Sequence, residues 1–376
     1  LALCTDNLSD PEIALPGEHF NTILYTGNGG TQALTGVGFA PDLFWNKNRT
    51  GTYQHMLYDT VRGVTKYLTS GETDAEATDV NSLTAFDSDG VTLGSAGSSN
   101  ATSVTSVGWN WKAGGAPTAD NTEDPGAVPT AGSVKIDGSN LGSALAGTIA
   151  ATKISANTTN GFSIVEWTGT GANATIAHGL SQVPEMIITK NLSEAFGWMV
   201  YQAYDHASPE TQYMVLNSTS AVTTWDEFMN DTLPTDSVST VGVADNVNKS
   251  GNNFIGYFFH SIEGYSKVGS YEGNGNADGP FVYVGFKPKF VIVKNSNLAD
   301  DWEIYDGTLN PYNYLDLGLK PNTSGAEYAL NTNNRAWDFT SNGFKVRGSN
   351  GGINQSGDSL IYIAFAESPF KYSNAR

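Results

Sequence analysis

The sequence predicts an all-β protein made of three tandem β-sandwich or jelly-roll-like repeats, with a linker and a short helix between the first two. Three observations predict this class: a repeated residue spacing, strand-like alternation of apolar residues, and many turn residues. The chain has 376 residues, of which 42 are glycine, and only 15% are charged. This mixture is typical of short strands joined by tight turns, whereas helical proteins carry more Glu, Lys and Leu.

The repeated spacing is the strongest of the three observations. An aromatic residue opens each unit ahead of two glycines, in "YTGNG", "WTGTG" and "YEGNG". A proline follows 16 or 17 residues later, Lys-Asn begins six residues after the proline, and a tyrosine lies eleven residues after the lysine. The positions that define this repeat scaffold are Tyr25, Pro41, Lys47, Tyr58, Trp167, Pro184, Lys190, Tyr201, Tyr271, Pro288, Lys294 and Tyr305. Offsets held in three copies indicate internal repeats of about 100 residues.

Alternation within the units predicts strands. In "PKFVIVKN" (288–295), apolar residues occupy both alternating faces, so we expect a strand buried on both sides. A proline just before the strand fits its first position, where a missing N–H costs little. Glycine pairs such as Gly27/Gly29 and Gly273/Gly275 suit tight turns that close hairpins.

The repeats divide the chain into five parts. We expect the end of an upstream segment at 1–19, sandwich repeats at 20–113, 162–263 and 264–376, and a Pro/Gly/Ala-rich linker at 114–161. Within the linker, Leu141, Leu145 and Ile149 follow the spacing i, i+4, i+8 and form the best helix candidate of the chain. Two glycines in the same stretch weaken this helix by ~1 kcal/mol each.

Charge and cysteine content exclude several classes of function. The net charge is −19, and the few Lys and Arg are scattered, so we expect no nucleic-acid partner and no adhesion to anionic membranes. No apolar run approaches the ~18 residues of a membrane span, so we expect no membrane insertion. A single cysteine, Cys4, excludes intrachain disulfides and multi-cysteine zinc sites.

Catalytic motifs are absent from the sequence. It contains no Gly-x-Ser-x-Gly elbow, no P-loop and no His-Glu-x-x-His, and its five histidines are dispersed. "DSDG" (87–90) resembles the start of a calcium loop, but the closing Glu is missing, and we interpret it as a turn. We therefore expect no enzyme, no catalytic residue, no cofactor and no metal site.

Two acidic stretches combine carboxylates with aromatic residues, as sugar-binding faces do. "WDEFMND" (225–231) and "ADDWEIYD" (299–306) supply the candidate ligand contacts Trp225, Asp226, Asp300, Asp301 and Trp302. Core packing is the favoured alternative for the second stretch, because His55 and Trp198 occupy the place of Trp302 in the other copies. We then expect any contact with a partner in the loops that differ between copies, "RTGTYQ", "LSEAFG" and "SNLADD".

The aligned units resemble a family of uncharacterised, repeat-containing, tail-fibre-like virion proteins of tailed bacteriophages, especially marine ones. The resemblance covers nearly the whole chain and is carried by "FNTILYTGNGGTQALTGVGFAPDLFWNKNR", "SLTAFDSDGVTLGS", "VGWNWKAGG", "GYSKVGSYEGNGNADGPFVYVGFKPKFVIVK" and "IYIAFAESPFKYSNAR". It implies a structural protein of the virion, in a tail fibre or other host-facing appendage that supports adsorption. It also implies a homo-oligomer, with a trimer favoured, contacts with other virion proteins, and a host-surface glycan as a candidate partner.

Other readings of the sequence remain open. The protein could be a capsid decoration or head-fibre protein, or a carbohydrate-binding adhesive module outside any virion. A depolymerising tailspike enzyme is disfavoured, because such spikes are long parallel β-helices with short repeats. The three copies could also form a pseudo-threefold unit within one chain. The middle copy departs from the pattern with "TDSVS", which puts equal function of the copies in doubt.

Overall fold

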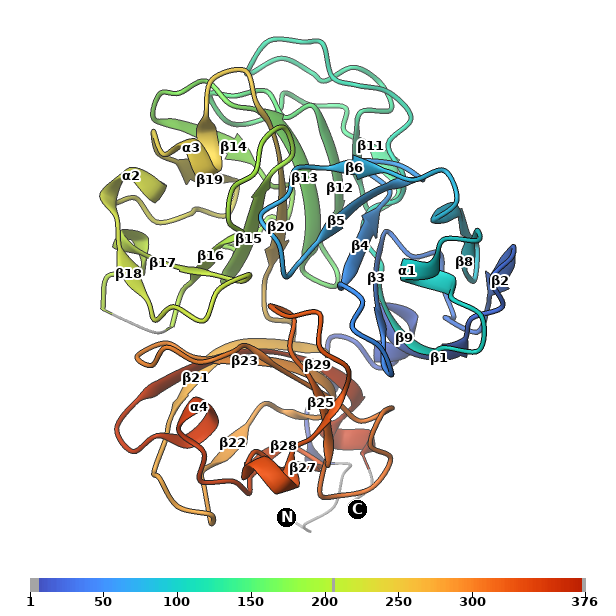
Figure 1. Ribbon diagram of the computed structural model, residues 1–376. Coiled ribbons are helices and arrows are strands. Elements are labelled where there is room, and N and C mark those ends of the chain that lie inside the picture. Colours follow the sequence, from blue (N-terminus) through green and yellow to red (C-terminus); the bar gives the residue numbers. More distant parts are fainter. Residues whose placement is uncertain (1–6, 205–206, 374–376) are drawn as a thin grey trace.

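The structure is a computed structural model that describes residues 7–204 and 207–373. Residues 1–6, which begin the expected upstream segment and include Cys4, lie outside the described residues. The predicted all-β class is confirmed: the chain forms three lobes of strands, and the helices among the described residues are limited to single turns (Figure 1). These include the 3-10 turns η2 (Pro16–Glu18), η3 (Pro209–Thr211), η4 (Asn331–Asn333) and η5 (Phe370–Tyr372).

The first repeat is a sandwich of a six-stranded and a three-stranded sheet. The larger sheet has the order β1-β9-β3-β4-β5-β6, formed by β1 (Phe20–Thr26), β9 (Thr105–Trp111), β3 (Leu43–Asn48), β4 (Met56–Asp59), β5 (Lys66–Thr69) and β6 (Ala77–Thr78). The smaller sheet has the order β2-β8-β7, formed by β2 (Gln32–Leu34), β8 (Gly90–Leu93) and β7 (Leu83–Asp87). The "DSDG" stretch closes the β7–β8 hairpin as a turn, and α1 (Gly97–Asn100) precedes β9.

The third repeat has the same two sheets in the same order. Its larger sheet is β21-β29-β23-β24-β25-β26, formed by β21 (Ser266–Glu272), β29 (Ser359–Pro369), β23 (Phe286–Asn295), β24 (Glu303–Asp306), β25 (Leu317–Leu319) and β26 (Tyr328–Ala329). Its smaller sheet is β22-β28-β27, formed by β22 (Phe281–Tyr283), β28 (Gly343–Val346) and β27 (Trp337–Thr340), and α4 (Gly351–Asn354) precedes β29. The sequence spacing therefore encodes one topology.

The second repeat keeps the six shared strands of the larger sheet but differs in its smaller sheet and in the strands added beside β13. The shared strands are β13 (Phe162–Thr168), β20 (Asn253–Phe259), β15 (Met186–Asn191), β16 (Met199–Gln202), β17 (Gln212–Val215) and β18 (Thr223–Thr224). The smaller sheet has only two strands, β14 (Ala174–Ala177) and β19 (Val238–Val241), and α3 (Asp245–Asn248) precedes β20. A short helix, α2 (Asp226–Met229), precedes β19 where the other copies have a third strand.

The expected linker at 114–161 needs correction. Its second half adds strands to the sheet of the second repeat beside β13, namely β10 (Val134–Ile136), β11 (Ser139–Asn140) and β12 (Lys153–Asn157). The predicted helix at 137–154 is not formed. Gly147 has φ +99°, which a helix does not allow, and both Gly147 and Ile149 make bridges to Ile176 of β14. Burial of Leu145 and Ile149 in the second sandwich outweighs the helical spacing.

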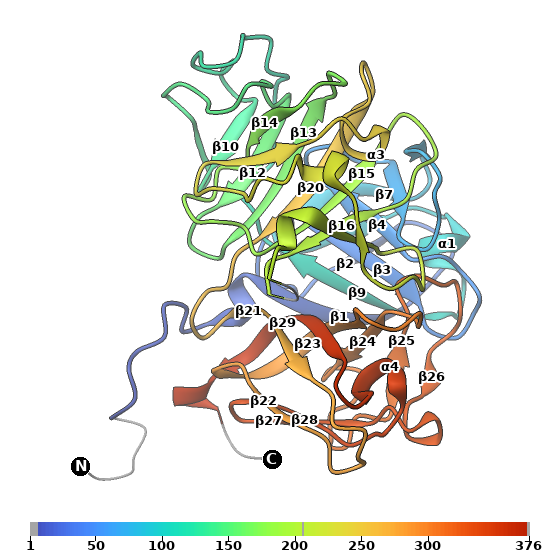
Figure 2. The same ribbon diagram turned by 90° about the vertical axis from the view of Figure 1, so that its left-hand side faces the viewer.

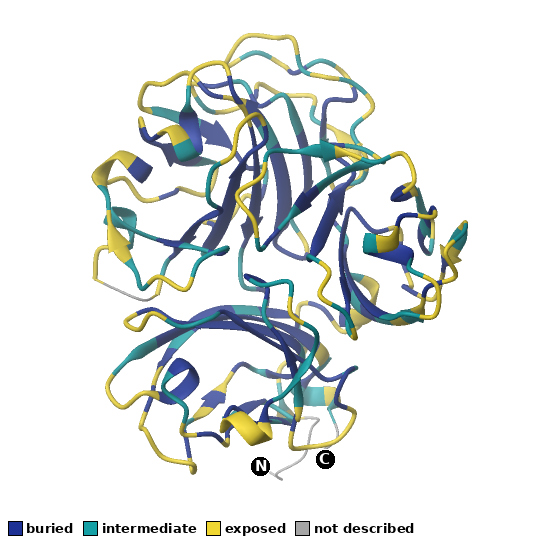
Figure 3. Cartoon of the chain, viewed as in Figure 1, coloured by how far each residue is buried: buried dark blue, intermediate teal, exposed yellow. Residues whose placement is uncertain are grey.

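The central strands β3, β15 and β23 of the larger sheets are buried on both faces, as the alternation predicted for residues 288–295. In β23, Val291 and Val293 face the core of their own sandwich, whereas Phe290 and Ile292 face a central core. That central core also receives residues of the larger sheets of the other two repeats, such as Trp45 and Ile188. Figure 3 shows the buried strands at the middle of the molecule and the exposed segments at its periphery. The three sandwiches thus share one centre.

A backbone hydrogen bond recurs at each border between repeats. Glu76 N–H donates to Leu192 O at 3.0 Å, and Val222 N–H donates to Ser296 O at 2.7 Å. The third bond runs from Glu327 N–H to the carbonyl of Arg49 at 2.8 Å. The three donors each precede the last strand of a larger sheet, and the three acceptors each follow a Lys-Asn pair.

These bonds run from the first repeat to the second, from the second to the third, and from the third back to the first. Contacts that follow one direction and close on themselves form a ring with cyclic pseudo-symmetry. The sheets meet closely: β1 and β9 lie against β21, β23 and β29 (Figure 2), and the rings of Phe20 and Phe365 stack at 4.9 Å. One chain therefore builds a closed pseudo-threefold ring.

Candidate functional site

The repeated Lys-Asn pair holds the loop that follows it. Lys47 is fully buried, and its Nζ donates to Asn48 O at 2.6 Å and Gly51 O at 3.2 Å. Asn48 Oδ1 accepts the N–H groups of Thr50 and Gly51 at 3.0 and 2.9 Å. The ammonium of Lys47 and the Oδ1 of Asn48 thus satisfy backbone groups that a turn would otherwise leave open.

The other two copies repeat this arrangement. Lys190 Nζ donates to Asn191 O at 3.0 Å and, across the border with the first repeat, to Thr73 O at 3.0 Å. Lys294 Nζ donates to Asn295 O at 2.5 Å. Burial lowers the pKa of Lys47 and of Lys190 to about 8. The lysines of the motif are therefore structural parts of the loops.

The aromatic scaffold residues are also structural. Tyr58, Tyr201 and Tyr305 are each at most 1% exposed. Tyr25 and Tyr271 donate their hydroxyls to the carbonyls of the short helices, Ser99 O at 2.6 Å and Ile353 O at 2.8 Å. Pro41 and Pro184 precede β3 and β15, and Pro288 lies at a bulge within β23. None of the scaffold positions presents a functional group to a partner.

An asparagine missed in the sequence analysis secures each glycine loop. Asn100 Nδ2 donates to Gly94 O at 2.8 Å and Gly30 O at 2.7 Å, and Asn28 N–H donates to its Oδ1 at 2.9 Å. Asn248 and Asn354 make the same kind of contacts. The sequence signal was available, because each asparagine lies six residues after a glycine: Gly94 and Asn100, Gly242 and Asn248, Gly348 and Asn354.

The glycine pairs join the two sheets of a sandwich, and the expected hairpin turns are not formed there. A Cβ at Gly27 would lie 2.2 Å from Ala101 O, so only glycine allows the loop to approach α1. Gly29 has φ +69°, a region that glycine adopts without strain. The equivalent residues of the third repeat behave alike: Gly273 would clash with Gln355 O at 2.2 Å, and Gly275 has φ +69°.

Three of the five candidate ligand contacts are engaged in internal interactions. Trp302 is 2% exposed, belongs to the central core, and donates from Nε1 to the carbonyl of Val215 in the second repeat at 3.1 Å. Asp300 pairs with Arg335 at 2.7 Å, and Asp301 pairs with Lys320 at 2.7 Å. The core-packing alternative therefore describes Trp302, and the sugar-face reading of this stretch is not supported.

Trp225 and Asp226 lie elsewhere, at the outer end of the second repeat. Asp226 is exposed, whereas Trp225 is half-buried and packs its ring 5.6 Å from that of Tyr213. The structure does not bring these two residues together with Asp300, Asp301 and Trp302 in one cleft: no described pocket lining combines them.

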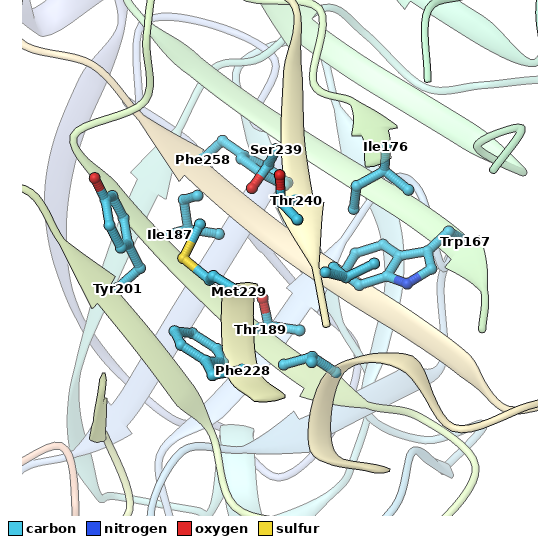
Figure 4. Close-up of a pocket in the computed structure, with 12 residues that line it drawn as sticks. Trp167, Ile176, Ile187, Thr189, Tyr201, Phe228, Met229, Ser239, Thr240 and Phe258 are labelled. Carbon is cyan, nitrogen blue, oxygen red and sulfur yellow. The ribbon is translucent and has the colours of Figure 1, made fainter. Parts of the chain in front are cut away.

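Two interior gaps are too small to be ligand sites. Inside the second repeat, twelve side chains including Trp167, Phe228 and Met229 surround a cavity of about 10 Å³, close to the space of one water (Figure 4). Helix α2 supplies Phe228 and Met229, so it fills the space beside the two-stranded sheet. A second cavity of about 30 Å³, lined by apolar residues of all three repeats, lies in the central core.

A larger cleft lies where the first repeat meets the segment that leads to the second. This linker cleft has a volume of about 430 Å³. Its lining includes His19, Asp42, Phe86, Lys112, Asp137 and Thr159.

Asp42 anchors one wall of the linker cleft. Its carboxylate accepts Thr60 Oγ1–H at 2.9 Å and the backbone N–H groups of Ala113 and Gly115 at 2.7 and 3.3 Å. Burial raises the pKa of Asp42, and the hydrogen bonds and the charge of Lys112 counter that rise. The acceptor sites of Asp42 are thus used to hold the start of the linker in place.

Lys112 is the cation of the linker cleft. Within residues 7–204 and 207–373, no hydrogen-bond acceptor or ion-pair partner contacts its ammonium. Burial lowers the pKa of His19, and the neighbouring Lys112 charge lowers it further. The cleft therefore places an unpaired ammonium in the same lining as the imidazole of His19 and the two carboxylates of Asp42 and Asp137.

Exposed aromatic side chains gather on the third repeat. Phe281 and Tyr283 lie two residues apart on the edge strand β22 and are 48% and 61% exposed. Tyr312 and Tyr314 are 81% and 50% exposed and belong to a loop beside β27, where Asn313 Nδ2 donates to a backbone carbonyl at 2.7 Å. These rings lie on the outside of the ring of sandwiches and are accessible to a partner.

The fold and the repeated contacts define a modular protein of three β-sandwich repeats. The chain belongs to the family described as Domain of unknown function (DUF7483), whose model matches residues 15–138 and residues 135–369. Searches of curated proteins and of solved structures found no match. In the described part of the chain, no group of three or more His, Cys, Asp or Glu side chains could hold a metal ion. No described helix is long and apolar enough to cross a membrane.

Proposed function

We propose that this protein is a structural component of a bacteriophage virion, located in a tail fibre or another host-facing appendage, where it supports adsorption to the host surface. The ring of three sandwiches carries this proposal. A shared core and cyclic border contacts make a rigid body, and its exposed loops and aromatic rings are free for contact with a partner. The resemblance of the repeats to phage tail-fibre-like proteins gives the biological setting.

The proposal includes association with other virion proteins and with copies of the same chain, a trimer being the favoured state. The ring borders are already occupied within one chain, so further copies would associate through outer surfaces. The mass in solution tests this part: a single chain has 39.9 kDa, and a trimer would have three times that mass, about 120 kDa.

Antibodies against the purified protein test the location. We expect gold-labelled antibodies to bind tailed phage particles at a tail appendage in electron micrographs. Labelling over the capsid would instead favour a decoration or head-fibre protein. Two negative results together would refute the virion assignment. Phage particles whose genome encodes the protein would bind no antibody, and an immunoblot of their denatured proteins would show no band.

A further inference from the structure

We propose that the linker cleft binds a short saccharide, with the ammonium of Lys112 as the central donor. This inference goes beyond the virion assignment and stands independently of it. It also differs from the sequence-based candidates, because none of Trp225, Asp226, Asp300, Asp301 or Trp302 lines the cleft.

The cleft has the size and the permanence of a small-ligand site. Its volume of about 430 Å³ falls within the range of about 300–1,000 Å³ that such sites occupy. Three sets of hydrogen bonds fix its walls. One set joins Asp42 to the linker backbone. The second joins Asn160 Nδ2 to Lys112 O at 2.7 Å, and the third joins Asp137 to Thr158 at 2.8 and 2.6 Å. Walls held in this way need little rearrangement on binding.

The groups that remain available match the chemistry of a sugar ring. Lys112 offers an ammonium donor without a carboxylate in contact. The exposed Asp137 accepts one bond from Thr158 at each oxygen and keeps a second lone pair on each for a further donor. Sugar hydroxyls both donate and accept hydrogen bonds, so they can satisfy both kinds of group. Phe86 is half-exposed in the lining and supplies an apolar ring surface for C–H groups. A strongly anionic ligand such as a nucleotide fits less well, because the chain carries −19 and the cleft contains two carboxylates.

One wall of the cleft lies outside the repeated scaffold, although the scaffold residue Pro41 is also part of the lining. Its linker wall, residues 112–116 and 137–138, comes from the segment between β9 and β12. At the border between the second and third repeats, β20 ends at Phe259 and β21 begins at Ser266, so no comparable segment exists there. The linker cleft therefore has no counterpart at the border between the second and third repeats.

Binding to an array of neutral and acidic oligosaccharides, followed by calorimetric titration of the strongest binder, tests the proposal. Lys112→Met removes the ammonium but keeps an unbranched side chain. Ala116→Trp places a bulky ring at an exposed position of the lining. Tyr283→Ala is the matched control, because Tyr283 belongs to the accessible aromatic rings of the third repeat. Melting temperatures establish that each variant is folded.

We expect Lys112→Met to weaken binding at least about tenfold, the loss expected for one charge-assisted contact. Ala116→Trp should weaken it by a similar factor because the indole ring occupies the cleft, and Tyr283→Ala should leave it unchanged. Two results would overturn the proposal: no binding of the native chain to any arrayed oligosaccharide, or loss of binding in Tyr283→Ala together with full binding in Lys112→Met. Should Lys112→Met fail to fold, ¹³C-methylated lysines in the native chain report on the same contact. The Lys112 resonance is identified as the one that disappears in the Lys112→Arg variant. In the native chain this resonance should shift when the saccharide is added, and an unchanged resonance at saturating saccharide would overturn the proposal. None of these readouts depends on where the protein lies on a virion.

Discussion

Trp302→Ala tests the shared central core most directly. The side chain is 2% exposed, lies in the core common to the three repeats, and bonds to Val215 O in the neighbouring repeat. Truncating a buried tryptophan costs about 3–5 kcal/mol through lost apolar transfer and the cavity left behind. Loss of the hydrogen bond adds about 1 kcal/mol. We therefore expect a loss of about 4–6 kcal/mol, which is a large part of the stability of an ordinary domain.

Urea unfolding followed by far-ultraviolet circular dichroism measures this loss without relying on tryptophan emission. Trp225→Ala is the matched control, since Trp225 is half-buried at the outer end of the second repeat, and we expect it to cost about 1 kcal/mol. Because the three sandwiches share one core, the native chain should unfold in a single transition. Equal costs for the two variants, or three separate transitions in the native chain, would refute the shared core.

Two further predictions concern the repeated scaffold. Gly27→Ala should destabilise the protein by more than about 2 kcal/mol, because its Cβ would lie 2.2 Å from Ala101 O, whereas Gly17→Ala, with no atom within 4 Å, should be nearly neutral in the same urea assay. Burial lowers the pKa of Lys47 and of Lys190 to about 8, below their usual 10.5, so the unfolded chain binds more protons between these values. Stability should then rise with pH above about 8, by up to ~1.4 kcal/mol per unit for each lysine. Urea titrations at about pH 7.5 and 9.5 should show this rise in the native chain and lose it in the Lys47→Met, Lys190→Met double variant.

The repeats and their strands could be predicted because their causes are local. The Lys-Asn offset recurs because Asn48 Oδ1 and Lys47 Nζ both bind the backbone of the loop that follows, and this works only at that spacing. The aromatic residue that opens the first and third repeats recurs for a similar reason. The hydroxyls of Tyr25 and Tyr271 each donate to a backbone carbonyl of a short helix. Short-range hydrogen bonds of this kind leave a fixed pattern in the sequence.

The closed ring could not be derived in the same way. Its border bonds join backbone groups such as Glu76 N–H and Leu192 O, which any residue could supply, and the partners are far apart in the chain. Trp302 shows the consequence, because its burial depends on a different repeat and its own neighbours in the sequence are acidic. The extra strands β10–β12 escaped prediction because the helical spacing of Leu141, Leu145 and Ile149, which lie between β11 and β12, dominated the pattern of this segment. Burial of Leu145 and Ile149 in the second sandwich depends on residues of another part of the chain.

Three repeats in one chain allow differences that three identical subunits would exclude. In a homotrimer, symmetry gives every border the same residues. Here the linker cleft occurs at one border, the exposed aromatic rings gather on the third repeat, and the middle repeat replaces a sheet strand with α2. The scaffold contacts around Lys47, Lys190 and Lys294 stay alike while these outer features diverge. Any recognition by this protein should therefore be directional around the ring, with a partner bound at one border or one repeat and not at three equivalent places.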